Sequence, residues 1–69
     1  MHEHIYKKLE VVGTSPNSID EAIRNAIHRS SASIRELRWF EVSEIRGDIN
    51  GSEVAHYQVT LKLGFRVEE

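Results

Sequence analysis

Apolar side chains recur along this chain in three blocks of different period. In the first block, residues 3–12, apolar positions alternate with polar ones, and the apolar set is Ile5, Leu9 and Val11. A period of two is typical of a β-strand with one wetter face. Residues 13–16, Gly-Thr-Ser-Pro, interrupt the alternation. The sequence therefore predicts a strand that ends at about residue 12.

The second block has the period of a helix. Its apolar residues recur at spacings of three, four, seven and eight: Ile19, Ala22, Ile23, Ala26, Ile27 and Ile34. Such a stripe is typical of an amphipathic helix that packs on one side. Two start signals compete, since Ser15 with Pro16 fits an N-cap followed by proline, whereas Ser18 with Glu21 fits a capping box. The pattern predicts the helix and leaves its first residue open.

The third block, residues 38–67, is predicted to be a β-hairpin. Asn50-Gly51 supplies the two positive-φ residues of a type I′ turn. With these two residues as the loop, Ile49 faces Ser52. Counting back from the loop gives three further cross-strand pairs: Val42 with Val59, Phe40 with Leu61, and Trp39 with Lys62.

This register divides the hairpin into two faces. The apolar face, which receives the helix, holds Phe40, Val42, Tyr57, Val59, Leu61, Leu63, Phe65 and Val67, and the register points Arg46 to the same side. The polar face, called the helix-free face below, holds Trp39, Glu41, Ser43, Ile45, His56, Gln58, Thr60, Lys62 and Arg66. The predicted fold is α+β, a β-α-β-β unit whose three-stranded antiparallel sheet carries one helix on one face.

Length and composition favour association between copies of the chain. The 69 residues form one domain, residues 1–69, of a size at which a single core leaves folding close to balance. The chain has no cysteine, so neither a disulfide nor a thiolate metal site stabilises it. The predicted sheet also keeps an uncovered face and a free edge. We therefore expect copies of the chain to associate.

Charge and hydropathy exclude several classes of protein. Nine Lys and Arg stand against eleven Asp and Glu, with the signs interspersed, which disfavours a nucleic-acid partner. No apolar stretch approaches the length of a membrane span, and the N-terminus lacks the pattern of a signal peptide. The expectation is a cytoplasmic protein with no membrane partner.

Catalysis and metal binding find little support in the sequence. Serines 30, 31 and 33 have no evident neighbouring base, and residues 13–15 lack the further glycines and lysine of a phosphate loop. His2 and His4 point the same way on a strand, but no carboxylate is fixed beside them. We expect no catalytic residue and no metal site, so an enzyme is the least favoured class.

Trp39 is the strongest candidate for a binding function. A lone tryptophan on the helix-free face is either an aromatic buried at a subunit contact or a stacking platform for a flat ligand, and the pattern alone does not separate the two. Gln58 lies on the same face and can donate and accept hydrogen bonds at the edge of a stacked ring. Gln58 favours the platform.

Three segments resemble the dodecin family, in the same order and over almost the whole chain. They are residues 10–15 (EVVGTS), residues 39–42 (WFEV) with 45–47 (IRG), and residues 57–59 (YQV) with 64–66 (GFR). The resemblance implies a non-catalytic protein for flavin storage and photoprotection. It also implies a hollow homododecamer that holds flavins in pairs between the tryptophans of symmetry-related subunits.

The resemblance also assigns residues to the flavin, either FMN or riboflavin. Trp39 would stack on the isoalloxazine, Gln58 would bond its edge, and Arg46 matches a position that binds FMN in bacterial members. The flavin-lining stretch of such members is matched by His4, Ile5 and Tyr6. His4 stands where some relatives have lysine, so this charge depends on pH. The predicted helix-side position of Arg46 is in tension with its implied role.

Coenzyme A is a further ligand that the resemblance allows. Lys7, Arg29 and Arg66 match positions of a coenzyme A site between subunits of bacterial dodecins. On sequence alone such cations are more often solvated surface charges, although cations from several subunits can converge on a phosphate. Two other functions stay open: a structural oligomer in which Trp39 and Ile45 seal an interface, and a less favoured single-stranded nucleic-acid binder with one aromatic platform.

Overall fold

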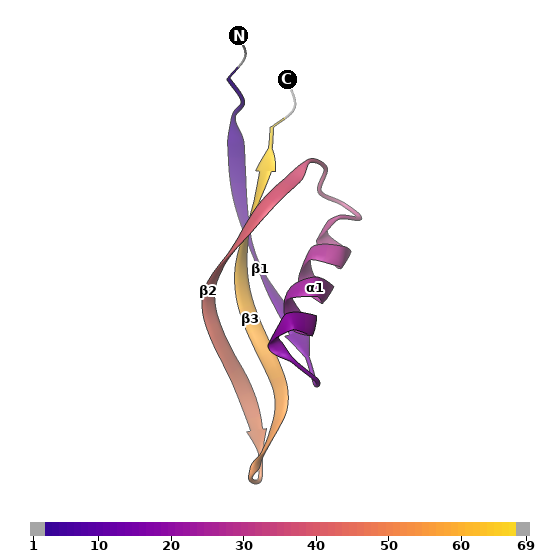
Figure 1. Cartoon of the computed structure of the whole chain (residues 1–69), viewed down its shortest axis with the longest axis vertical. Helices are drawn as coiled ribbons and strands as arrows, with labels where there is room; N and C mark the ends of the chain where they lie inside the picture. Colours follow the sequence, from indigo (N-terminus) through magenta and orange to yellow (C-terminus); the bar gives the residue numbers. More distant parts are fainter. Residues whose placement is uncertain (1–2, 68–69) are drawn as a thin grey trace.

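The computed structural model describes residues 3–67. Its elements are β1 (Tyr6–Ser15), α1 (Ile19–Ser30), β2 (Leu37–Asn50) and β3 (Glu53–Arg66). β3 lies in the middle of the sheet and pairs antiparallel with β1 on one side and β2 on the other. α1 covers one face of the sheet, and the β2–β3 hairpin extends beyond it (Figure 1). The predicted β-α-β-β fold is confirmed.

β1 begins and ends about three residues later than the alternation predicts. Gly13, Thr14 and Ser15 continue the strand, pairing with Val59, Gln58 and Tyr57 of β3. Gly13 is needed for packing, not for a turn, because a Cβ there would lie 2.8 Å from the Ala26 side chain and still closer to the Ala22 carbonyl oxygen. Gly13, which the sequence pattern indicates as an interruption of the strand, therefore lets α1 lie close against β1.

The second of the two competing start signals begins α1. The Ser18 hydroxyl caps the helix by accepting a hydrogen bond from the Glu21 backbone N–H at 3.0 Å. Ser15 instead ends β1, where its buried hydroxyl donates to the Glu21 carboxylate at 2.7 Å. This bond and a second one from the Asn17 side chain lower the pKa of Glu21. The carboxylate thus joins the end of the strand to the start of the helix.

Ile34 lies outside α1, so its assignment to the helical stripe was wrong. α1 ends at Ser30, and the backbone N–H of Ser33 bonds the Ser30 carbonyl at 3.1 Å in a following turn. The Ser31 hydroxyl donates to the His28 carbonyl at 2.7 Å. Such local bonds let a serine-rich stretch leave the helix early. No helix among residues 3–67 has the length and apolar character needed to span a membrane.

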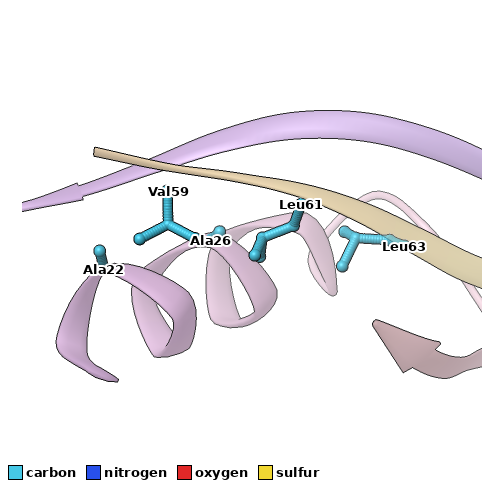
Figure 2. Packing of buried hydrophobic residues seen from close by; sticks show 5 residues of the cluster. All are labelled: Ala22, Ala26, Val59, Leu61 and Leu63. Carbon is cyan, nitrogen blue, oxygen red and sulfur yellow. The ribbon is translucent and has the colours of Figure 1, made fainter. Parts of the chain in front are cut away.

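The core of the protomer is small. Two alanines of α1 pack on three alternate side chains of β3, and the buried hydrophobic cluster consists of Ala22, Ala26, Val59, Leu61 and Leu63 (Figure 2). Ten large apolar side chains are exposed within residues 3–67: Ile5, Tyr6, Leu9, Val12, Trp39, Phe40, Val42, Ile45, Ile49 and Val54. The radius of gyration is 14.4 Å, against about 11 Å for a compact domain of this length. An extended protomer with this much exposed apolar surface favours association.

The hairpin register differs from the predicted one at the loop. Asn50 is the last residue of β2 and pairs with Glu53, so the loop is Gly51-Ser52. Gly51 has a φ of 67°, as the first central residue of a type II′ turn has. Towards the start of β2 the predicted pairs are displaced by two residues: Val42 faces Leu61, Phe40 faces Leu63 and Trp39 faces Gly64. A displacement of two keeps Trp39 on its predicted face.

A β-bulge between Val42 and Glu44 changes the faces of the residues that follow. The bulge adds Ser43 to β2 without a partner on β3, which inverts the alternation beyond it. Ile45 consequently pairs with Val59 on the helix side, and Arg46 pairs with Gln58 on the helix-free face. Both were predicted on the opposite side, and the tension over Arg46 is removed.

Candidate functional site

Trp39 lies flat over the backbone of Gly64. A Cβ added to Gly64 would stand closer than 3.0 Å to three atoms of the six-membered ring, Cδ2, Cε2 and Cζ2. The three distances are nearly equal, which places the glycine under the ring face and not at its edge. One face of the indole therefore rests on the sheet, and the side chain stays 39% exposed. The opposite face is a flat aromatic surface on the helix-free side.

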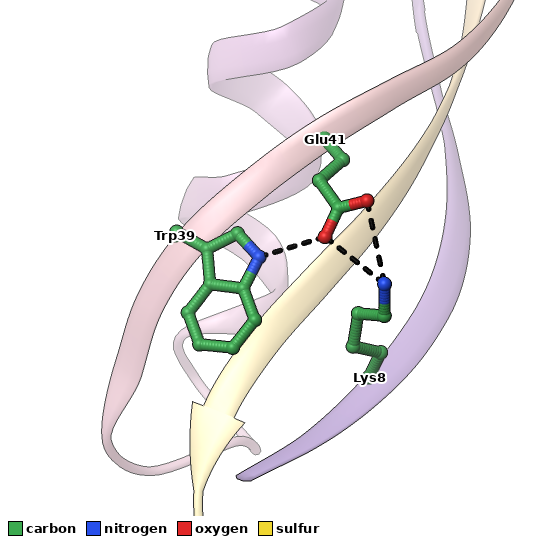
Figure 3. Close-up of polar contacts among 3 residues, drawn as sticks. All are labelled: Lys8, Trp39 and Glu41. Atoms are coloured by element: carbon green, nitrogen blue, oxygen red, sulfur yellow. Dashed lines mark hydrogen bonds and ion pairs between the residues drawn. The ribbon is translucent and has the colours of Figure 1, made fainter.

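Two further contacts hold the indole in place. The Tyr6 ring of β1 meets it edge to face, with centroids 5.4 Å apart and planes at 66°. The indole Nε1–H donates to Glu41 Oε2 at 2.9 Å. Lys8 Nζ donates to the same carboxylate, to Oε2 at 3.1 Å and to Oε1 at 3.3 Å (Figure 3). The platform is thus held by residues from all three strands.

The Glu41 carboxyl is kept ionised by the same contacts. Its pKa is lowered first by the hydrogen bond from Trp39, then by the bond from Lys8, with the positive charges of Lys8 and Lys62 adding to the effect. A glutamate is ionised at neutral pH at its ordinary pKa, and the lowered pKa keeps the carboxylate that accepts the indole hydrogen bond into more acidic solution.

Gln58 and Arg46 form a second part of the site, away from Trp39. They face each other across β3 and β2, with Thr14 of β1 on the other side of Gln58. Arg46 also lies 4.0 Å from the Asp48 carboxylate. Gly64 lies six positions after Gln58 along β3, which corresponds to about 20 Å. Trp39 and Gln58 lie on the same face of the sheet, but within one protomer they are too far apart to contact the same ligand ring.

The predicted flavin-lining stretch lies at the Trp39 end of the sheet. The His4 ring stands edge to face with Tyr6 at 6.5 Å, and Tyr6 pairs with Arg66. Ile5 is 62% exposed, and its carbonyl accepts a hydrogen bond from the Val67 N–H at 2.8 Å. Tyr6 is the member of this stretch that touches the platform.

The three candidate coenzyme A residues divide between two hollows of the protomer. Lys7 and Arg66 line one of about 410 Å³ together with residues 33–35. Arg29 lines another of about 350 Å³ between α1 and the free edge of β1, beside Gly13 and Asn25. The protomer joins Lys7 with Arg66 but leaves Arg29 apart from them.

Metal-ligating groups do not gather within residues 3–67. No cluster of three or more His, Cys, Asp or Glu side chains is present in that range. The paired histidines considered above cannot be judged together, because His2 lies outside the described residues.

Three residues that shape the platform were missed by the sequence analysis. Glu41 had a local signal, since it stands two residues after Trp39 and thus on the same face of the strand. Lys8 and Gly64 had none, because their roles depend on the pairing of Gly64 with Trp39 on one side and with Lys8 on the other. A lysine and a glycine of a strand show such roles only after pairing is known.

The fold and site define a small β-α-β-β protein with an aromatic platform on an uncovered sheet face. The chain matches the dodecin family over residues 5–68 and belongs to that family, whose members are small non-catalytic proteins that bind flavins and form oligomers. It is 51% identical over 65 residues to the dodecin of Thermus thermophilus, a match that covers 94% of each chain.

Solved structures agree with the family assignment. Dodecin from Streptomyces coelicolor is 56% identical and superposes with a TM-score of 0.95, covering 100% of this chain and 99% of that one. Dodecin from Streptomyces davaonensis is 50% identical, also with a TM-score of 0.95, and covers 99% of this chain and 100% of that one. The protomer fold over residues 3–67 is therefore that of a dodecin.

Proposed function

We propose that this protein stores and photoprotects a flavin, FMN or riboflavin, in the cytoplasm. The flavins are held in pairs between Trp39 side chains of symmetry-related subunits in a hollow homododecamer. The observation that carries the proposal is the outward indole face, which a fixed glycine contact leaves flat and accessible. Stacking an isoalloxazine there removes apolar surface from water and adds dispersion and π contact.

The distance between Trp39 and Gln58 supports a site that is shared between subunits. Trp39 and Gln58 of one protomer lie about 20 Å apart along β3, farther than the two can reach across one isoalloxazine. A ring stacked on Trp39 of one subunit would therefore meet Gln58 of a neighbour. The exposed apolar residues of the protomer supply the surface for that association.

Arg46 supports a phosphate-bearing flavin. The bulge after Val42 turns its side chain to the same face as Gln58. A guanidinium beside the residue that bonds the ring edge suits the phosphate of FMN. His4, at the Trp39 end, would add a charge that is present only when the imidazole is protonated.

Photoprotection would come from the indole itself. Trp39 is an electron donor held in stacking contact, so it would quench the excited state of the bound ring before side reactions occur. Glu41, Tyr6 and Gly64 contribute by holding the indole in one orientation.

The test is a flavin titration followed by fluorescence, with Trp39→Ala and Trp39→Phe as variants. Loss of the stacking contact should weaken binding about 10- to 100-fold in Trp39→Ala, and Trp39→Phe should fall between it and the wild type. Phe40→Leu, a change on the helix side of the same strand, is the matched control. Wild-type affinity in Trp39→Ala would refute the stacking role, and an oligomer indifferent to flavin would favour the structural alternative.

Coenzyme A is a second candidate ligand, favoured by the hollow that Lys7 and Arg66 share. Two cations in one hollow suit a phosphate group, and Arg29 would have to come from another subunit. Purification at low salt followed by mass spectrometry of released small molecules tests this. Retained coenzyme A that is lost in Arg66→Ala supports the site, and its absence from the wild-type protein argues against it.

A further inference from the structure

A chain of polar contacts, called the charged bridge below, links Lys8 of β1 to Trp39 of β2 through the Glu41 carboxylate. Lys8 of β1 and Trp39 of β2 both pair with Gly64 of β3, from opposite sides. Because this residue has no side chain, nothing on β3 separates them there. Glu41 lies between the two and bonds both, the indole at 2.9 Å and the ammonium at 3.1 Å (Figure 3).

The contact with Gly64 does not by itself fix the orientation of the indole. A flat ring over a glycine can turn over by about 180° about the Cβ–Cγ bond and still lay one face on that contact. The indole has a single hydrogen-bond donor, Nε1–H, and its acceptor within residues 3–67 is Glu41 Oε2. This bond therefore decides which edge of the indole faces β1, and Lys8 holds the carboxylate that accepts it.

We propose that Glu41 is the positioning residue of the aromatic platform and that Lys8 supports it, so that the indole is oriented before any ligand arrives. This inference rests on the proposed flavin-binding function. An indole that is already held in one orientation does not have to be ordered when the flavin binds. A surface ordered in the free protein loses less entropy when it binds.

The bridge requires the ionised form of Glu41 and is therefore sensitive to acid. Lys8 and Glu10 face it from β1, Lys62 faces it from β3, and Glu44 follows it on β2. The contacts of Glu41 lower its pKa, so the charged bridge is intact at neutral pH. It is lost as the pH falls through that lowered value, when the carboxyl takes up a proton.

The orientation can be measured without ligand because Trp39 is the only tryptophan of the chain. The probe is the ultraviolet resonance Raman band that reports hydrogen bonding of the indole N–H, read beside tryptophan emission in the flavin-free full-length protein. Glu41→Ala should shift both signals to those of an unbonded indole, Glu41→Gln should shift them in part, and Lys8→Met should shift them least. Glu10→Gln, which removes a carboxylate on the same face opposite Lys62, is the matched control and should leave both unchanged.

Flavin titration of the same variants separates this inference from the proposed function. Loss of one hydrogen bond should weaken flavin binding of Glu41→Ala about 2- to 10-fold, with far-ultraviolet circular dichroism unchanged. Wild-type Raman and emission signals in Glu41→Ala would overturn the positioning role even if flavin binds well. Shifted signals in a protein whose wild type ignores flavin would instead support the bridge and refute the proposed function.

Discussion

The glycine under Trp39 offers a sharp perturbation, Gly64→Ala. The added Cβ would lie closer than 3.0 Å to three ring atoms of Trp39, whereas carbon atoms in ordinary contact are about 3.5–4.0 Å apart. The indole would have to move away from the sheet by about 1 Å or more. Its 2.9 Å hydrogen bond to Glu41 would lengthen or break.

The expected effect falls on binding more than on folding. Overpacking costs about 1–3 kcal/mol in a closed core, but this indole is 39% exposed and can move outward, so we expect the lower end of that range. Flavin affinity should fall about tenfold, because the displaced ring no longer matches the stacking geometry. Thermal unfolding, tryptophan emission and flavin titration measure these effects separately.

His56→Ala is the matched control for Gly64→Ala. His56 lies on the same strand and the same face, opposite Asp48 and far from Trp39. It should leave tryptophan emission unchanged. The reasoning fails if Gly64→Ala keeps both the emission and the flavin affinity of the wild type.

Three further substitutions test the fold and the site. Leu61→Ala empties the centre of the buried cluster and should lower the free energy of unfolding by about 2–5 kcal/mol in denaturant titrations; a loss below about 1 kcal/mol would contradict the assigned core. Ser18→Ala removes the helix cap and should lower it by about 1 kcal/mol, whereas a neutral result would mean that the cap is dispensable. Arg46→Ala should weaken binding of FMN about tenfold or more while sparing riboflavin, and equal losses for the two in parallel titrations would remove the phosphate role.

The order of the elements and the sheet face on which Trp39 lies could be predicted from the sequence, because each depends on local periodicity. The capping box at Ser18 and the apolar stripe of α1 are short-range signals, and the structure uses both. Gly13 was misread because a glycine in a strand has the same appearance in sequence whether it breaks the strand or admits a helix. Only the contact with Ala22 and Ala26 distinguishes the two.

The register of the hairpin could not be predicted from its turn residues. Asn-Gly strongly favours a two-residue loop of its own, yet Asn50 extends β2 and the loop moves to Gly51-Ser52. The bulge at Ser43 leaves no signal in the hydrophobic pattern, since serine is common on either face. One unpaired residue there decides that Arg46, and not Ile45, shares a face with Gln58.

The proposed division of the site between subunits depends on a distance that the sequence pattern did not give. Trp39 and Gln58 look like partners because both occupy the helix-free face, and only their separation along β3 shows that one protomer cannot join them. Association and ligand binding are then expected to depend on each other, since in the proposed site a neighbouring subunit supplies Gln58.

Native mass spectrometry of the purified protein, with and without added FMN, tests this dependence most directly because it reports subunit number and bound ligand together. The account predicts a homododecamer that takes up FMN in pairs. A monomer that binds a single FMN, or an oligomer whose mass is unchanged by FMN, would contradict it.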